Sequence, residues 1–325
     1  MNQQTITALC LALASPVGCT PPPGDGADDT RSVHSDEPDT ADPFSPTTQL
    51  LSAGWDHTCA VAPTGELTCW GNNSYGETTV PDSLGTIVSV SAGGWHTCAL
   101  NAAKHVTCWG NDDWGQTAVP ETLGETVSVV AGAHHTCALE VTGRVICWGS
   151  TEFGQSNVPD TLGDVAALSA TGFHTCALDT TGRGRCWGNN AYGQSTVPDD
   201  LEPLVAISPG AFHTCAMDAA GAVDCWGTNS LGETNIPDDL LDSTSISAGG
   251  WHTCALDSAG KATCWGRNEQ SESSVAAYLP PMASLSAGAH HTCARQAAGA
   301  VTCWGADEYG QSTVPLSVSA ADIAR

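Results

Sequence analysis

Short runs of small, β-branched and aromatic residues, separated by glycine and proline, fill the chain from residue 51 onward. Within residues 128–166, the runs SVVAG, HTCAL and VICWG are each five residues long, and a fourth run, QSNVP, ends on proline. No window is long and apolar enough to predict a helix. A proline in a run is typical of an edge strand, because proline cannot donate a backbone hydrogen bond. The pattern therefore predicts an all-β protein built from units of four short strands.

The same unit recurs every 39 residues, seven times in all. A small β unit repeated at this period predicts a β-propeller, with an open β-solenoid as the alternative. We favour the closed ring because no copy has the different, polar design of a capping repeat. The expected fold class is all-β, a seven-bladed β-propeller of seven 39-residue repeats over residues 49–325. Residues 314–325 are expected to close the ring by pairing with the strand at residues 49–54.

The second and third runs of each copy form a β-hairpin with a tight turn. We expect a positive φ at the glycine of this turn. In the second copy Lys104 replaces the glycine, and there we expect a strained or differently shaped turn. Asp179, Asp218 and Asp257 begin the turn in three copies, where an aspartate side chain readily bonds to the backbone. The recurring glycines are Gly65, Gly143, Gly182, Gly221, Gly260 and Gly299.

Two cysteines per copy face each other across this hairpin. With the turn centred on residue 64, Cys59 lies opposite Cys69, and His57 lies opposite Gly71. Directly opposed residues are within disulfide reach, so we predict seven disulfides and an oxidising compartment. The alternatives are a reduced thiol pair and a metal site on His57, Cys59 and Cys69. The predicted pairs are Cys59–Cys69, Cys98–Cys108, Cys137–Cys147, Cys176–Cys186, Cys215–Cys225, Cys254–Cys264 and Cys293–Cys303.

The N-terminal part of the chain predicts export. Residues 1–19 contain an apolar run too short to span a membrane, typical of a signal peptide. Cleavage after Ala12-Leu13-Ala14 would release a secreted protein, whereas Val17-Gly18-Cys19 resembles a bacterial lipobox. Cys19 is the cysteine left over once the repeats are paired and the signal is removed, which favours a lipid on Cys19. Residues 20–48 are rich in Pro, Asp and Ser and predict a disordered acidic linker.

The chain carries nine Lys and Arg against 35 Asp and Glu, for a formal charge of −26. Such a charge makes nucleic acid a poor partner, and an anionic membrane is a poor partner for the same reason. We therefore expect membrane contact only through a lipid on Cys19. We also expect the protein to be a monomer.

The repeat resembles that of the regulator of chromosome condensation (RCC1) family of seven-bladed propellers. In the second copy the resemblance rests on Ala92-Gly93, His96-Thr97, Cys108-Trp109-Gly110 and Gly115-Gln116. The sixth copy departs from it, with Ser271 for the usual Gly and Ala276 for the usual Pro, which puts its outer segment in doubt. The 39-residue repeats look most similar to a secreted bacterial branch, exemplified by the seven-bladed β-lactamase inhibitor protein. The resemblance to that branch implies aromatic residues, just before the repeated His, that bind a partner protein on one face of the ring.

The position before the repeated His varies in a patterned way and is aromatic or imidazole in six copies. In the first copy Asp56 stands there and Trp55 precedes it. These residues either form a binding rim or pack between blades, and His134 and His290 leave metal binding or pH sensing open. The candidate rim is Trp55, Trp95, His134, Phe173, Phe212, Trp251 and His290.

The residues that recur unchanged predict structure rather than chemistry. Each repeated His is expected to donate to a neighbouring backbone carbonyl, and each Trp of the CWG run to pack between blades. No nucleophile, base and orienting group stand together, so we expect no enzyme activity, no catalytic residue, no metal and no cofactor. The expected function is that of an extracellular or cell-envelope module that binds a protein or glycan. The alternatives are a structural envelope protein and, by family analogy, a guanine-nucleotide-exchange regulator.

Overall fold

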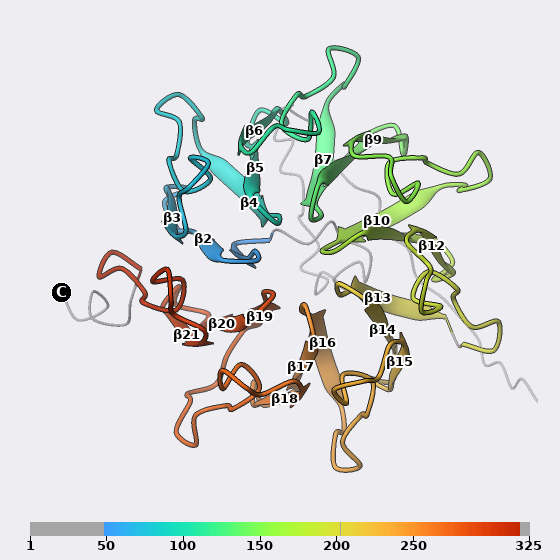
Figure 1. Ribbon diagram of the computed structural model, residues 1–325, viewed down its shortest axis with the longest axis vertical. Coiled ribbons are helices and arrows are strands. Elements are labelled where there is room, and N and C mark those ends of the chain that lie inside the picture. Colours follow the sequence, from blue (N-terminus) through green and yellow to red (C-terminus); the bar gives the residue numbers. More distant parts are fainter. Residues whose placement is uncertain (1–48, 202, 319–325) are drawn as a thin grey trace, which may run out of the picture. The chain divides into compact units, whose positions relative to one another are not determined.

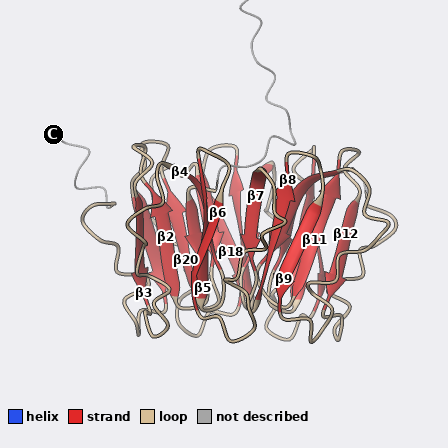
Figure 2. Ribbon diagram, turned by 90° about the horizontal axis from the view of Figure 1, so that it is seen from above, coloured by secondary structure: helices blue, strands red, loops and turns tan. Residues whose placement is uncertain are grey.

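The computed structural model describes residues 49–201 and 203–318, which belong to one compact unit. The predicted signal peptide, the linker and Cys19 lie outside the described residues. The described chain forms seven antiparallel sheets arranged as blades around a centre (Figure 1). Seen from the side, the strands run from one face of the ring to the other (Figure 2). The predicted seven-bladed propeller is therefore confirmed.

Each blade has an inner, a middle and an outer strand in chain order. The inner strands are β1 (Leu51–Ala53), β4 (Ile87–Ala92), β7 (Thr126–Ala131), β10 (Val165–Ala170), β13 (Leu204–Pro209), β16 (Ser243–Ala248) and β19 (Ser284–Ala287). The middle strands are β2 (His57–Val61), β5 (His96–Asn101), β8 (His135–Glu140), β11 (His174–Asp179), β14 (His213–Asp218), β17 (His252–Asp257) and β20 (His291–Arg295). The outer strands are β3 (Leu67–Gly71), β6 (Val106–Gly110), β9 (Val145–Gly149), β12 (Gly184–Gly188), β15 (Val223–Gly227), β18 (Ala262–Gly266) and β21 (Val301–Gly305).

The fourth strand predicted for each blade does not form in the described chain, where every sheet has three strands. In blade three the donors of the fourth segment bond locally: the N–H of Asn157 donates to Gly154, and that of Leu162 donates to Pro159. Proline at 159 removes one further donor. The segment therefore turns across the outer strand, and Val158 packs into the core of the blade.

The middle and outer strands pair as the cysteine spacing predicts. Cys59 lies opposite Cys69 and His57 opposite Gly71, and the same register holds in the other blades. All seven disulfides are formed, with Cα–Cα distances of 4.0–4.1 Å. These bridges point to an oxidising compartment outside the cytoplasm.

The hairpin turns have the expected backbone. The six recurring glycines have φ between 75° and 100°, and Lys104 adopts φ 63°. The turn at Lys104 therefore keeps the shape of the others, and a side chain with a Cβ carries the strain of a left-handed conformation. The Asp257 carboxylate accepts from the N–H groups of Ala259 and Lys261, which is the predicted aspartate turn.

The ring closes differently from the prediction. The N–H of Ala53 donates to the Ser286 hydroxyl (3.0 Å), and the N–H of Ala289 donates to the Gly54 carbonyl (3.1 Å). The C-terminal segment bonds to blade seven, where the Val318 carbonyl accepts from the N–H of Val301, and Val318 belongs to a core cluster that also holds Leu51 of blade one. The prediction that residues 314–325 close the ring by pairing with residues 49–54 is therefore wrong for the described part of this segment, which ends at Val318. The strand β1 instead pairs with β2 as the inner strand of blade one.

Serine hydroxyls of the inner strands link neighbouring blades near the centre. Ser91, for example, accepts from the backbone N–H of Ala131 in the next blade (2.9 Å). Val130 replaces the serine in blade three, and Pro209, which has no N–H, faces Ser169 across the junction of blades four and five. The same bond joins Ser52 to Ala92, Ser208 to Ala248, Ser247 to Ala287 and Ser286 to Ala53.

This difference between junctions predicts a matched pair of substitutions. Ser91→Ala leaves the buried N–H of Ala131 without an acceptor and should lower the free energy of unfolding by about 1–3 kcal/mol. Ser169→Ala removes the same hydroxyl where no N–H faces it, and should change that free energy by less than about 0.5 kcal/mol. Urea unfolding of both variants measures the difference, and equal losses would show that the hydroxyl bond is not the cause.

Candidate functional site

A closed circle of side-chain hydrogen bonds joins the repeated His of each blade to the repeated Thr of the next. All fourteen side chains are fully buried. The partner of each His is thus a threonine hydroxyl, and the predicted backbone carbonyl is wrong. The seven Nε2···Oγ1 pairs are His57–Thr97 and His96–Thr136 (2.9 Å), His213–Thr253 (2.8 Å), and His135–Thr175, His174–Thr214, His252–Thr292 and His291–Thr58 (2.7 Å).

The geometry fixes the proton on each of these histidines. The Thr97 hydroxyl donates its single proton to the Glu77 carbonyl (2.8 Å), so His57 Nε2 must be the donor to Thr97. Nδ1 of His57 is then the unprotonated nitrogen, and it is buried without a partner. Burial lowers the pKa of His57 to about 4 and that of His96 to about 3. Each imidazole is therefore neutral near pH 7, and its role is to link one blade to the next.

The Trp of each CWG run reinforces the same junction. Trp109 is nearly buried, and its Nε1 donates to the Glu77 carbonyl (3.0 Å), which therefore accepts from both the Trp and the Thr of the next blade. The predicted inter-blade packing of these tryptophans is confirmed. Among the described residues no group of three or more His, Cys, Asp or Glu could hold a metal ion.

The candidate rim residues come together on one face of the propeller. We call this set of seven side chains the inner ring. They lie in the turns between inner and middle strands, and each is half-buried. The successive ring centroids are 4.5 Å apart for Trp55–Trp95, 5.1 Å for Trp95–His134, 5.9 Å for His134–Phe173, 6.0 Å for Phe173–Phe212, 6.0 Å for Phe212–Trp251 and 4.9 Å for Trp251–His290. These side chains bury one another and still present one side outward. Their binding role stays a prediction.

Trp55 extends beyond its own blade. Its ring lies 5.9 Å from Phe173 of blade four, so it reaches across the centre of the face. Trp55 stands where the other blades have glycine or alanine, such as Gly94 and Ala133, and its N–H makes the same inter-blade bond. A large side chain at this position is directed over the centre of the ring. Asp56 stands at the pre-His position, and burial, with Glu308 and Glu77 nearby, raises the pKa of its carboxyl.

A second, outer ring surrounds the inner one, and the sequence interpretation missed it. Trp114, Phe153 and Tyr192 lie 5.8–5.9 Å from inner-ring residues of the next blade. Gln270 takes this position in blade six. An alignment of the seven 39-residue repeats could have shown this position, since a large apolar residue precedes the loop Gly in six copies. The outer ring is Tyr75 (53% exposed), Trp114 (49%), Phe153 (42%), Tyr192 (59%), Leu231 (44%) and Tyr309 (52%).

Fixed loops present the outer ring. The N–H of Trp114 donates to the buried side chain of Gln116 (2.9 Å), and Gly115 between them has φ 75°. The other blades use the same bond, with Glu or Gln as acceptor. Ser271 holds the glycine position in blade six with φ 66°, so this loop keeps its shape under strain. We call the two rings together the aromatic face.

Blade six differs from the other blades, because Gln270 interrupts the outer ring there and Arg267 forms a charged cluster beside it. The Arg267 guanidinium donates to His290 Nδ1 (2.7 Å) and to Glu269, lies 3.5 Å from Glu272, and stands 5.7 Å from the Trp251 ring. Burial and Arg267 together lower the pKa of His290. Because Arg267 donates to Nδ1, His290 carries its proton on Nε2. Metal binding by His290 through Nδ1 would require Arg267 to leave.

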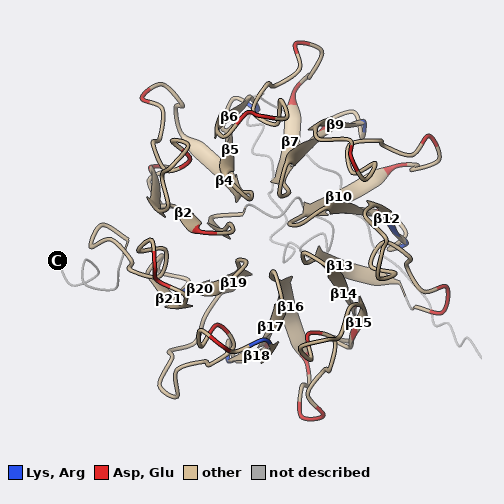
Figure 3. Ribbon diagram, viewed as in Figure 1, with Lys and Arg blue, Asp and Glu red and all other residues tan. Residues whose placement is uncertain are grey.

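The loops of the aromatic face are acidic. Arg267 is their single basic residue. Acidic residues are spread over the blades of the described chain, and Lys and Arg are few (Figure 3). The acidic residues of the aromatic-face loops, apart from the buried Glu77, Glu233 and Glu272, are Asp56, Asp112, Asp113, Glu152, Glu269, Asp307 and Glu308.

Seven interlocked three-stranded blades define the class of protein, a closed seven-bladed β-propeller. The regulator of chromosome condensation (RCC1) repeat matches residues 49–77, 87–116, 126–155, 165–194, 204–233, 244–272 and 282–311. The chain therefore belongs to the RCC1 repeat family. A search of curated protein sequences found no match. The described part of the chain contains no helix long and apolar enough to cross a membrane.

Solved structures share this fold at low sequence identity. The CRINKLY WD40 ectodomain of the Arabidopsis thaliana receptor kinase ACR4 aligns with a TM-score of 0.65 and 23% identity, covering 79% of this chain and 95% of that one. The CR4 ectodomain of Physcomitrella patens gives 0.68 and 22%, covering 79% and 73%. Yeast RCC1 (Prp20), solved with Kap60, gives 0.64 and 21%, covering 93% and 89%. At these identities the likeness shows the fold alone.

Proposed function

We propose that the protein is a binding module that works outside the cytoplasm and engages another protein through the aromatic face. The outer ring carries this proposal: six large apolar side chains, 42–59% exposed, stand in register around one face. Large apolar side chains gathered and exposed on one face are typical of interaction sites. Aromatic side chains held by rigid loops lose little conformational freedom on binding and dominate binding energy.

Charge supports a partner with a basic surface. The carboxylates of the aromatic-face loops outnumber Arg267, and opposite charges steer encounter and fix register. The charged cluster of blade six breaks the near-sevenfold symmetry, so a partner can recognise one rotational setting. A structural envelope protein without a ligand is the second candidate, and a glycan is the alternative ligand.

The same proposal covers the remaining expectations. The protein is a monomer without enzyme activity or cofactor, and it does not bind nucleic acid. It is either secreted or held at the cell envelope by a lipid on Cys19, with the seven disulfides supporting the compartment.

Capture of partners by the full-length mature protein tests the proposal. A variant with Trp114→Ala, Phe153→Ala and Tyr192→Ala should keep its fold, because these side chains are exposed, and should bind the captured partner at least about 30-fold more weakly. Leu241→Ala with Tyr278→Ala, which removes exposed apolar side chains outside the aromatic-face loops, is the matched control.

Each outcome of this experiment decides between the candidates. Loss of binding in the aromatic variant alone supports the aromatic face, and treatment of the partner with glycosidases separates protein from glycan. Equal binding by both variants would place the site elsewhere. No partner for the native protein would favour the structural candidate.

A further inference from the structure

The turn between β10 and β11 in blade four differs from the same turn in the other six blades, because Thr171 begins it. Close packing requires glycine at this position. A Cβ at Gly93 in blade two would lie 2.5 Å from the Gly132 carbonyl oxygen of the next blade and 2.6 Å from Cε1 of His96. Thr171 has a Cβ and therefore cannot take the place that glycine takes elsewhere. The other six copies have Gly54, Gly93, Gly132, Gly210, Gly249 and Gly288.

Three consecutive backbone N–H groups hold this turn in blade three. The N–H of Ala131 donates to the Ser91 hydroxyl of blade two (2.9 Å). The N–H of Gly132 donates to the His135 carbonyl (2.9 Å), which closes the turn. The N–H of Ala133 donates to a carbonyl of blade four (2.7 Å), so that the turn is tied to both of its neighbours.

In the described structure of blade four, none of these three bonds forms at the equivalent residues, Ala170, Thr171 and Gly172. Ala170 faces Val130, which has no hydroxyl. The N–H of Thr171 makes no bond to the His174 carbonyl, and that of Gly172 makes none to blade five. Ala170 and Thr171 are half-buried, whereas the residues at both positions are buried in the other six blades. The turn of blade four is therefore displaced toward solvent.

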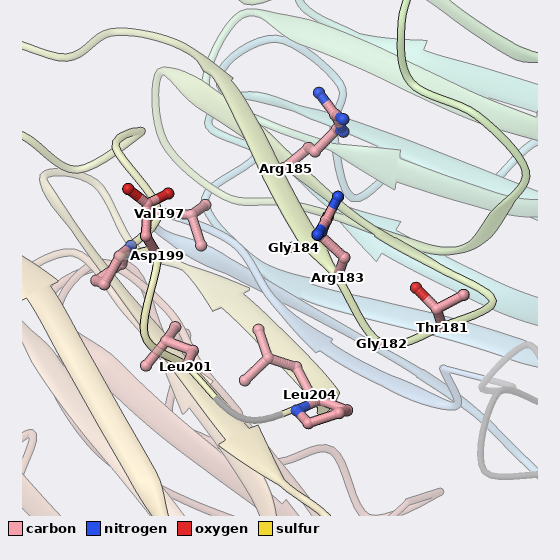
Figure 4. Close-up of a pocket in the computed structure, with 11 residues that line it drawn as sticks. Thr181, Gly182, Arg183, Gly184, Arg185, Val197, Asp199, Leu201 and Leu204 are labelled. Carbon is pink, nitrogen blue, oxygen red and sulfur yellow. The ribbon is translucent and has the colours of Figure 1, made fainter.

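The junction of blades four and five is loosely packed elsewhere as well. Pro209 lacks the N–H that Ser169 would accept from, and β10 and β13 are the least closely packed pair of neighbouring inner strands. At the opposite face of the ring, a pocket of about 540 Å³ is lined by Gly182 of the hairpin turn and by Leu201 and Leu204 at the entry to blade five (Figure 4). Sparse packing and unpaired amides are typical of the parts of a fold that open locally at low cost.

We infer that residues 171–173 form a movable turn of the aromatic face, which opens and closes against blade five while the other six turns stay closed. Phe173 lies at its end and contacts four other rings at centroid distances of 5.8–6.0 Å, among them Trp55 over the centre of the face. Opening of the turn therefore shifts Phe173 against its neighbours. The bond between His174 and Thr214 (2.7 Å) keeps blade four in the ring. The consequence for binding rests on the proposed function: a partner selects the position of Phe173 that fits its surface.

Hydrogen exchange of the full-length protein, followed by mass spectrometry, tests the inference without a partner, so its outcome is separate from that of the capture experiment. After correction for intrinsic rates, the amides of residues 170–172 should exchange at least about tenfold faster than those of residues 131–133. Thr171→Gly removes the Cβ, lets the turn form two of the missing bonds and should slow this exchange about tenfold. Thr171→Ala keeps the Cβ and is the matched control, with exchange as fast as in the native protein.

The reciprocal substitution places a Cβ in a closed turn. Gly93→Ala should speed the exchange of residues 92–94 in blade two at least about tenfold, because its Cβ meets the carbonyl of Gly132. Circular dichroism checks that each variant is folded, and Thr171→Gly decides the question if Gly93→Ala does not fold. Equal exchange in the two native turns, no slowing in Thr171→Gly, or equal slowing in Thr171→Ala would overturn the inference.

Discussion

Lowering the pH from 7 to 5 should remove most of the stability of the propeller. The seven repeated histidines are fully buried, and burial lowers the pKa of each from 6.5 to about 3 or 4. On unfolding, each imidazole regains its ordinary pKa and takes up a proton. The unfolded chain therefore binds more protons than the folded one in the window from pH 6.5 down to about 3–4, and stability falls as pH falls.

The size of this effect follows from the number of histidines. Between pH 7 and pH 5 each buried imidazole contributes a loss of about 2 kcal/mol, or roughly 13 kcal/mol for all seven. Typical domains have 5–15 kcal/mol of stability in total, so we expect unfolding near pH 5. Asp56, whose pKa is raised, acts in the opposite direction, but it is one partly exposed group.

Urea unfolding at several pH values between 7 and 5 measures this loss. In this window carboxylates of ordinary pKa stay ionised and do not confuse the slope. His135→Gln, whose amide can still donate to Thr175, should reduce the loss by about 2 kcal/mol. His105→Gln at an exposed position is the control and should leave the slope unchanged. A free energy of unfolding that is the same at pH 7 and pH 5 would show that the buried histidines are not the neutral links described here.

The features that could be predicted from the sequence are those that depend on strand register within one hairpin. The spacing of Cys59 and Cys69 around a glycine turn sets which residues face each other, and strand pairing follows from that alone. The partner of His57 could not be read in this way. Its Nε2 meets Thr97 of the next blade, a contact across the ring that no local pattern encodes.

The prediction of a fourth strand in each blade was wrong for a related reason. An extended run that ends on proline can donate to a neighbouring strand or to its own turn, and sequence does not distinguish the two. In the aromatic face, the alignment showed which positions vary but not which of them lie side by side. The contact between Trp114 and His134 joins residues 20 positions apart in two blades, so only the closed ring brings the outer and inner rings together.

Full reduction of the disulfides should unfold the propeller even near neutral pH. Each bridge closes a loop within its own hairpin, with a sequence separation of 10, and in the chain-entropy model contributes about 2–3 kcal/mol. The seven loops do not overlap in the chain, so their contributions are close to additive. Their sum, roughly 14–21 kcal/mol, is comparable to or larger than the whole stability of an ordinary domain.

Access to the bridges decides how the experiment is done. The first cysteine of every pair is fully buried, so reductant must be added in denaturant and the denaturant then removed. We expect the reduced, alkylated chain to lack the strand signal in circular dichroism, and the oxidised chain taken through the same cycle to regain it. Intact mass before and after reduction counts the bridges by two hydrogens each and reports any lipid on Cys19.

A single pair separates the entropic effect from general damage to the core. Cys98→Ala with Cys108→Ala opens one hairpin of blade two and should lower the free energy of unfolding by about 2–3 kcal/mol while leaving the ring closed. The loss should be similar for the pair in blade five, Cys215 and Cys225, because loop length is the same. A reduced, alkylated protein that refolds with unchanged stability would show that the His–Thr circle and the tryptophan core hold the ring without the bridges.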